Sequence, residues 1–258
     1  MGHYKAVMRH DWLSWLFFQK GEIPSISGYA PKRHKKCVDL MIMKKDNNFD
    51  YGAQRKLGIL DTEFNNNNKI VAKATRDNGL KLGTIAAEQF SRKGRSAIDD
   101  TLSKRLFIDH QQSKRSCFAL TSSDLGGCYD RIIHIAAALA LRRIGVSKSR
   151  IHSMFEVIQK MIHRIRTAYG DSDLTYGGDS LEDWANYQQG ILQGNTAGPD
   201  IWSALSSVFF EVLHKRGFGC KIVTSISKQL FTLVGFAYVD DCDLHQTTPA
   251  IDQILHRT

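Results

Sequence analysis

The hydrophobic pattern of the first half of the chain predicts several short strands. Two apolar runs, Val38 to Met43 and Leu57 to Leu60, have the length and composition of buried strands. The polar segment Lys44 to Gln54 between them predicts a hairpin loop. A third strand is expected at Cys117 to Leu120. These short runs separated by longer helical segments indicate a mixed α and β domain.

Four segments have the apolar spacings of three, four and seven residues that are typical of amphipathic helices. They cover residues 96–108, about 130 to a stop at Gly145, 151–165, and 199–217 with Pro199 in the first turn. Ser147 or Ser149 can cap the third helix. His134, His152 and His163 fall on these helices without obvious partners. We interpret the three histidines as structural or exposed.

The beginning of the chain does not follow either period. Pro24, Gly28 and Pro31 interrupt the pattern. We therefore expect residues 1–37 to form an irregular N-terminal extension. The only low-complexity tract is Asn65 to Asn68, which is too short to indicate a disordered region.

Two adjacent aspartates interrupt the last apolar run. Leu230 to Tyr238 predicts a strand that stops at Asp240 and Asp241, and Cys242 to Leu244 resumes it. Adjacent carboxylates repel, and a hairpin turn is formed more easily by Asn-Gly. An exposed acidic turn is one explanation. A bound divalent cation, which would offset the repulsion, is the other.

A further carboxylate follows the strand at Cys117 to Leu120. Asp124 comes directly after this strand, and Asp130 lies at the start of the helix beyond. Oxygen ligands from two neighbouring strands suit Mg²⁺, which also binds substrate phosphates. For Asp130 a role near the site and a simple helix-dipole role both stand.

Composition narrows the class of protein. The chain has 258 residues, 42% hydrophobic and 24% charged, with a formal net charge of +9, as expected for a globular domain with a polyanionic partner. It contains no apolar run near the roughly 20 residues of a membrane span and no secretory signal. We expect an intracellular protein, in the nucleus or cytoplasm, without a membrane partner. The five scattered cysteines lack zinc-ligand spacing, which predicts reduced thiols.

Basic residues gather in two places. One group lies between Lys32 and Lys45, and the other includes Arg92, Lys93, Arg95, Lys104 and Arg105. These groups are either solvated surface or a groove for phosphates. We assign Arg92, Lys93 and Arg95 as candidate nucleic-acid-binding residues.

Three segments resemble motifs A, B and C of reverse transcriptases, in the order of that family. They are Phe118 to Ile132, Gln193 to Pro199, and Phe236 to Asp241. Upstream, Gln54 to Leu60 and the blocks Glu88-Gln89-Phe90 and Gly94 to Asp99 resemble the fingers segments of the retrotransposon and group II intron enzymes. The resemblance covers roughly residues 38–245.

The resemblance implies an α+β right-hand architecture of fingers and palm, in which an antiparallel palm sheet is backed by helices and the thumb is absent. The implied organisation is an extension at 1–37, fingers at 38–115, a palm segment with motif A at 116–146, a connection at 147–190, and a palm segment with motifs B and C at 191–258, truncated before the thumb. The implied activity is RNA-directed DNA synthesis, with an RNA template, a DNA or RNA primer and deoxynucleoside triphosphates as partners.

The same resemblance implies roles for individual residues. Asp124, Asp240 and Asp241 would be catalytic ligands of two Mg²⁺ ions. Substrate-binding roles fall to Tyr129 against the sugar, Gln193 and Gly194 in the nucleotide pocket, and Arg55 with either Lys44 or Lys45 on the triphosphate. Tyr129 can also serve as core packing.

Two alternatives remain. A viral RNA-dependent RNA polymerase shares the palm, but such enzymes generally carry an acid where this chain has Tyr129. A catalytically inactive nucleic-acid-binding remnant of a mobile element is the second.

Overall fold

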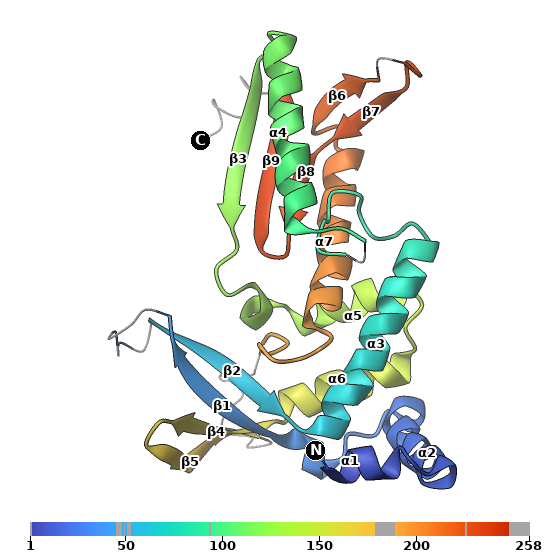
Figure 1. Cartoon of the computed structure of the whole chain (residues 1–258), viewed down its shortest axis with the longest axis vertical. Helices are drawn as coiled ribbons and strands as arrows, with labels where there is room; N and C mark the ends of the chain where they lie inside the picture. The colour runs from blue at the N-terminus through green and yellow to red at the C-terminus, as the bar shows by residue number, and fades with distance from the viewer. Residues whose placement is uncertain are drawn as a thin grey trace. The chain divides into compact units, whose positions relative to one another are not determined.

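The structure is a computed structural model of the whole chain (Figure 1). It describes residues 2–44, 48, 50, 53–92, 94–178, 189–224 and 226–247. Two compact units are present: Met1–Thr75 with Tyr129–Gly198, and Arg76–Cys128 with Pro199–Thr258. No helix in the described ranges combines the length and the apolar character needed to cross a membrane.

The first unit begins with helices where we expected an irregular extension. Helix α1 spans Gly2–Val7 and α2 spans Asp11–Ser27. Pro24 lies inside α2, and Gly28 ends the helix with a φ of 77°. The prediction for residues 1–37 was therefore wrong. Gly28 ends the helix, as glycine often does, but Pro24 does not interrupt it, and the preceding Trp12 to Phe18 segment is helical.

A four-stranded sheet of order β2-β1-β4-β5 forms the centre of the first unit. The strands are β1 (Lys36–Met43), β2 (Gln54–Leu60), β4 (Ile162–Thr167) and β5 (Gly170–Gly177). The β1–β2 hairpin expected from the sequence is confirmed, since these strands pair antiparallel. The β1–β4 pair is parallel. A 3₁₀ helix, Lys32–Lys35, leads into β1.

Helices α5 (His134–Arg143) and α6 (Lys148–Gln159) supply most of the core of this unit. Ser147 caps α6 as expected, and Gly145 follows α5 with a φ of 91°. The predicted helix 151–165 is too long, because β4 begins at Ile162. The expected helix start near Asp130 is a separate 3₁₀ helix, Cys128–Arg131. Ile135 and Leu139, expected in the core, are exposed on α5.

The three histidines are structural or exposed, as expected, but each of them has a partner. His134 is buried, donates a hydrogen bond from Nε2 to the carbonyl oxygen of Gly190, and contacts Gln159. His152 contacts the carbonyl of Gly28. His163 lies on β4 and is fully buried beside Asp39. His152 also lies 3.5 Å from Glu156, one helical turn away, whereas the partners of His134 and His163 are distant in sequence and could not be found from helical spacing.

A long helix, α3 (Thr62–Lys81), contains the Asn65 to Asn68 tract and continues from the first unit into the second. We predicted no helix in this segment, because four consecutive asparagines have poor helix propensity. The tract nevertheless includes the buried Asn68, and Phe64 and Val71 are buried on the same helix. Tertiary packing therefore outweighs propensity in this segment.

The second unit is built on a three-stranded antiparallel sheet of order β3-β9-β8. Its strands are β3 (Phe118–Asp124), β8 (Gly235–Tyr238) and β9 (Asp241–Thr247). The backbone of Phe90 and Glu88 pairs with Ala237 on β8. A smaller hairpin joins β6 (Cys220–Val223) and β7 (Leu230–Leu233). The run 230–238 expected as one strand is thus divided between β7 and β8.

Helices α4 (Ala97–Ser113) and α7 (Gly198–Lys215) pack on this sheet from opposite faces. Phe107 of α4 packs against Phe118 and Phe236, whereas Phe210 of α7 packs against Ala237. Since side chains alternate along a strand, Phe236 and Ala237 point to opposite faces. Ser96 caps α4 in a capping box with Asp99. The expected apolar stripe of α4, Ile98, Leu102 and Leu106, is exposed.

Candidate active site

The two adjacent aspartates lie at the tip of a tight hairpin in the second unit. Tyr238 of β8 pairs with Asp241 of β9, so Val239 and Asp240 are the two connecting residues. Val239 has a φ of 57°, whereas Asp240 is not among the residues of positive φ. This combination matches the φ pattern of a type II′ turn, which normally has glycine at its first central position. The sequence correctly predicted the strand, turn and strand.

Val239 makes this turn strained. A β-branched residue in the left-handed region is a genuine outlier and costs on the order of 1–3 kcal/mol. The indole N–H of Trp202, on α7, donates a hydrogen bond to the carbonyl oxygen of Val239. The bond holds the backbone at the residue immediately before Asp240. Strain that the surroundings enforce in this way is characteristic of functional sites.

Strand β3 brings the third carboxylate to the same end of the sheet. Asp124 is the direct cross-strand partner of Asp241. The backbone N–H of Leu125 donates to the carbonyl oxygen of Asp240 over 3.3 Å. Directly opposed residues on antiparallel strands have Cβ atoms about 4.5–5.5 Å apart. The fold therefore places Asp124 beside the Asp240-Asp241 turn.

A second pair of polar side chains lies next to Asp124 and Asp241 on the same face of the β3-β9-β8 sheet. Ser122 pairs with Asp243, and side chains of Ser122 and Asp124 share a face because they are two residues apart. Asp243 is buried, accepts a hydrogen bond from Ser122, and forms an ion pair with Lys104 of α4. Burial alone would lower the pKa of Lys104, but Asp243, Asp100 and Asp241 together raise it. Lys104 therefore sits as one cation among several carboxylates.

The donor chemistry of Asp124, Asp240 and Asp241 suits Mg²⁺, because all three offer hard carboxylate oxygens. Their side-chain oxygens are not grouped as tightly as the ligands of a single ion. In the described part of the chain, the three metal-ligating atoms that lie within 4.8 Å of one another belong to Cys37, Asp39 and His163. Two ions about 4 Å apart spread their ligands more widely than one ion does. The backbone pairing places the three aspartates at one end of the sheet, and their role as ligands of two ions is a proposal.

An apolar cavity of about 530 Å³ lies against the opposite face of the sheet from α4. Trp202, Leu205 and Phe209 of α7 line it together with Val239 and Cys242, which flank the aspartate pair. This cavity could not be predicted from the sequence, because its walls come from segments far apart in the chain. The same Trp202 that bonds to the turn thus also forms a wall of the cavity.

The expected nucleotide-pocket residues lie in the first unit. The N–H of Gly58 donates to the carbonyl oxygen of Gln193 over 2.7 Å. Gly194 has a φ of 118°, and a Cβ there would lie 2.2 Å from the carbonyl oxygen of Gly58. Both conditions require glycine. The Asn65 side chain secures the next turn by accepting from the N–H of Thr196 over 3.0 Å.

The other substrate-binding candidates are also placed in this unit. Arg55 is exposed on β2, and Lys44 is exposed at the end of the β1 hairpin. Lys45 lies outside the described residues. The choice between Lys44 and Lys45 therefore stays open.

Tyr129 lies on the 3₁₀ helix Cys128–Arg131 and is half-buried. Its carbonyl oxygen accepts from Ile191, and its ring would be 3.7 Å from a Cβ at position 198. Asp130 does not lie in the first turn of α5, which begins at His134. It lies instead in the short 3₁₀ helix Cys128–Arg131, so a dipole of α5 does not explain it, and both roles considered for Asp130 stay predictions.

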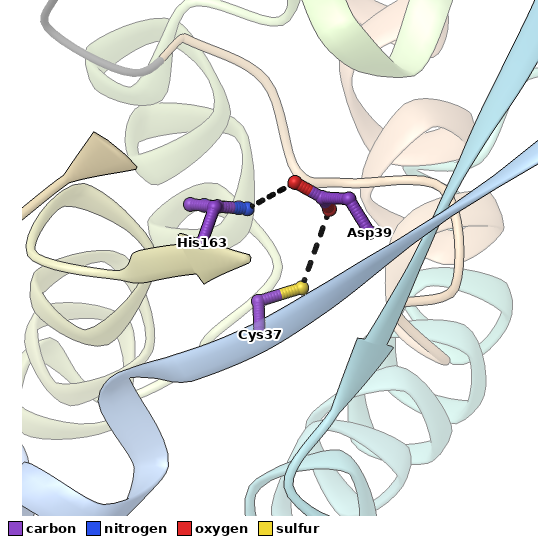
Figure 2. A group of neighbouring side chains, drawn as sticks. All are labelled: Cys37, Asp39 and His163. Carbon is purple, nitrogen blue, oxygen red and sulfur yellow. Dashed lines mark hydrogen bonds and ion pairs between the residues drawn. The ribbon is translucent and has the colours of Figure 1, made fainter. Parts of the chain in front are cut away.

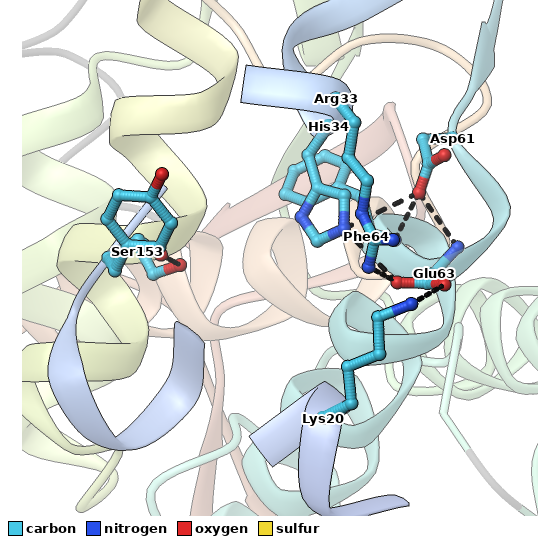
Figure 3. Close-up of polar contacts among 8 residues, drawn as sticks. Lys20, Arg33, His34, Asp61, Glu63, Phe64 and Ser153 are labelled. Atoms are coloured by element: carbon cyan, nitrogen blue, oxygen red, sulfur yellow. Dashed lines mark hydrogen bonds and ion pairs between the residues drawn. The ribbon is translucent and has the colours of Figure 1, made fainter. Parts of the chain in front are cut away.

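The basic clusters are partly neutralised within the chain. Figure 3 shows Arg33 and Lys20 paired with Glu63, beside the buried His34. In the second unit, Arg95 lies over the Phe90 ring at 5.4 Å, and Arg92 reaches the carbonyl of Ala87. Lys93 lies outside the described residues. Arg92 and Arg95 thus have intramolecular contacts, and Arg95 remains exposed.

Comparison with known proteins identifies similar folds among solved structures but does not assign the chain to a family. No protein-family model matches this sequence, and no curated protein matches it. The matching solved structures include telomerases, which are reverse transcriptases. Telomerase from Candida albicans in complex with a TWJ fragment of telomeric RNA is 11% identical, with a TM-score of 0.52, over 96% of this chain and 44% of that one. Apo telomerase from Candida tropicalis is 12% identical, with a TM-score of 0.55, over 89% and 42%.

These similarities establish a reverse-transcriptase-like α+β fold with antiparallel sheets. The chain spans less than half the length of the telomerase chains that it matches.

Proposed function

We propose that this chain is the fingers and palm region of an RNA-directed DNA polymerase from a mobile element of the retrotransposon or group II intron type. It adds deoxynucleotides to the 3′-hydroxyl of a primer. One observation carries the proposal. Asp124 and Asp241 are direct cross-strand partners at a strained two-residue hairpin, in a chain with a reverse-transcriptase-like fold.

The proposed centre uses Asp124, Asp240 and Asp241 as ligands of Mg²⁺. Bound in a pair, such ions activate an attacking hydroxyl and neutralise the charge that develops on the phosphates. The chain itself fixes the ligands. The Leu125 N–H bond to Asp240 and the Trp202 bond to Val239 hold the two strand ends in register. Preorganised ligands of this kind do not have to be rearranged during the reaction.

Further residues are proposed to contact the substrates. Gln193 and Gly194 line the nucleotide pocket, Arg55 with Lys44 or Lys45 binds the triphosphate, and Tyr129 lies against the sugar. Exposed Arg95, with Arg92 and Lys93, contributes to binding of the RNA template and the primer. An RNA partner is supported by the matched Candida albicans telomerase, which is in complex with a fragment of telomeric RNA.

The test is primer extension by the purified chain on an RNA template with Mg²⁺, supplied either with deoxynucleoside or with ribonucleoside triphosphates. We expect extension with deoxynucleotides. Extension only with ribonucleotides would instead identify an RNA-dependent RNA polymerase. Binding of the primer-template without any extension would identify an inactive nucleic-acid-binding remnant.

A further inference from the structure

A cluster of metal-ligating side chains lies on the four-stranded sheet of the first unit (Figure 2). Cys37 on β1 and His163 on β4 are direct partners across the parallel pair. Tyr176 on β5 is in turn the partner of His163. Asp39 lies two residues beyond Cys37 on the same face of β1. The strand register therefore brings together side chains that are more than a hundred residues apart in sequence.

Hydrogen-bond geometry links the members of this cluster. The Cys37 Sγ lies 3.5 Å from Asp39 Oδ1, and His163 Nδ1 lies 2.8 Å from Asp39 Oδ2. The Tyr176 hydroxyl also donates to Asp39. Cys37 is 3% exposed, and Asp39 and His163 are completely buried. One sulfur, one oxygen and one nitrogen ligand thus face one another out of contact with solvent.

We propose that Cys37, Asp39 and His163 bind a structural Zn²⁺ ion. Tetrahedral zinc with bonds of about 2.0–2.3 Å separates neighbouring ligand atoms by roughly 3.3–3.6 Å. The distance from Cys37 Sγ to Asp39 Oδ1 already has this value. The distance from His163 Nδ1 to the other carboxylate oxygen, Oδ2, would have to open by about half an ångström. One ligand atom of each residue lies within 4.8 Å of the other two, so a small adjustment of the side chains brings all three to one ion. Tyr176 adds a further oxygen donor to the cluster.

The charges of the ligand set favour the same ion. A thiolate and a carboxylate carry two negative charges, and a neutral imidazole adds none. A divalent cation therefore leaves the buried cluster without net charge, which avoids the high cost of an unpaired buried ion. A thiolate and an imidazole select zinc over Mg²⁺, which prefers oxygen ligands.

Gly58 leaves space beside the ligands. It is the cross-strand partner of Asp39 on β2, and it is not among the glycines of positive φ. A Cβ at this position would lie 3.2 Å from Cys37 Sγ, 3.4 Å from the carbonyl oxygen of Gln193 and 3.8 Å from Asp39 Oδ1. The backbone conformation does not require glycine here. Its missing side chain instead keeps the sulfur and the carboxylate uncrowded.

The site lies on β1 and β4 and would pin these two strands together, independently of any polymerase activity. The test uses the full 258-residue chain, freed of metal by a chelator and titrated with Co²⁺ as a spectroscopic substitute for Zn²⁺. We expect one equivalent to give a sulfur-to-cobalt charge-transfer band and the visible bands of tetrahedral cobalt, both abolished by Zn²⁺. A folded chain that shows no charge-transfer band at saturating Co²⁺ would overturn the proposal and leave a hydrogen-bonded network.

Variants assign the sulfur ligand. Cys37→Ser should lose the charge-transfer band, and His163→Gln should weaken Co²⁺ binding by more than the roughly 10- to 100-fold cost of losing an outer-shell partner. Cys220→Ser, which alters a buried cysteine of the second unit, is the matched control and should retain the band. Unchanged Co²⁺ binding in both test variants would contradict the assignment. If neither variant folds, X-ray absorption of the zinc-loaded wild type decides, because one sulfur among nitrogen and oxygen neighbours is required.

Discussion

Trp202 donates a hydrogen bond from its indole N–H to the carbonyl oxygen of Val239, the residue that precedes the Asp240-Asp241 pair. Val239 has a φ of 57°, which a β-branched side chain adopts only under constraint. The helix α7 therefore enforces the backbone of the turn through a single side-chain contact. Correct placement of the carboxylates should depend on this contact.

Trp202→Phe tests that dependence, because it keeps most of the ring but removes the N–H donor. Loss of the bond to this half-buried carbonyl should lower the free energy of unfolding by about 1 kcal/mol. We also expect kcat for primer extension to fall by about tenfold or more, since small misplacements of reacting groups are costly. Trp12→Phe, at an exposed position on α2, is the control. Lower stability with unchanged kcat would show that the bond supports the fold and not the turn.

Lys104 provides a second prediction, on stability. Lys104 neutralises the charge of the buried Asp243 carboxylate through an ion pair. Among the contacts described, the other hydrogen-bond donor to this carboxylate is Ser122. Lys104→Met should destabilise the chain by about 2–3 kcal/mol, because it leaves a buried charge unpaired. Urea unfolding measures the loss. The exposed Arg105→Met, which removes only a surface pair with Asp109, should cost less than about 0.5 kcal/mol.

A double variant separates the effect of the Lys104–Asp243 ion pair from the effects of the two single substitutions. Combining Lys104→Met with Asp243→Asn should recover much of the lost stability, since no buried charge then remains. A double variant as unstable as the sum of both single variants would contradict this explanation.

His245 makes stability depend on pH. It is buried between Phe107 and Phe236, and neither ring nitrogen has a hydrogen-bond partner among the described residues. Burial lowers its pKa from 6.5 to about 4. Between these values the unfolded chain binds the proton and the folded chain does not, so stability falls as pH falls from 6.5 towards 4. The full effect is about 3 kcal/mol.

His245→Phe should flatten the stability profile in that pH window, whereas the exposed His10→Gln should not. Unfolding measured at several pH values gives the comparison. An equal slope in wild type and His245→Phe would mean that other groups cause the acid sensitivity.

Tyr129 should decide which sugar the enzyme accepts. An aromatic ring against the sugar leaves no room for a 2′-hydroxyl, and burying that hydroxyl without a partner costs roughly 1–3 kcal/mol. Tyr129→Ala should therefore raise ribonucleotide use relative to deoxynucleotide use by about tenfold to a hundredfold. The measurement is the ratio of kcat/KM for the two sugars on one primer-template. An unchanged ratio would assign Tyr129 to core packing.

The local sequence pattern predicted the elements that are specified by residues close together in the chain. The hairpin at Asp240-Asp241 and the cap of α6 at Ser147 follow from neighbouring residues. The helix 151–165 was drawn too long because Ile162 and Ile165 continue a helical spacing, although they lie on a strand. A short apolar run fits both the helical and the strand period. Here the pairing of β4 with β1 makes the segment a strand.

Long-range contacts could not be predicted in this way. The Trp202–Val239 bond joins a helix to a turn, and the Cys37–His163 pair depends on the parallel register of β1 and β4. Neither contact can be predicted from the spacing of residues within one segment. The aspartates were found because their chemistry is unusual for a turn, whereas a single cysteine and a single histidine are not unusual anywhere.

Primer extension by Asp124→Asn tests the central claim most directly. The substitution keeps the size of the side chain and removes the negative charge that a metal ligand needs. The account predicts that wild type and the exposed control Asp173→Asn extend an RNA-templated primer with deoxynucleotides, and that Asp124→Asn loses at least about a hundredfold in kcat while remaining folded. Full activity in folded Asp124→Asn would contradict the assignment of the Asp124, Asp240 and Asp241 cluster as the catalytic centre.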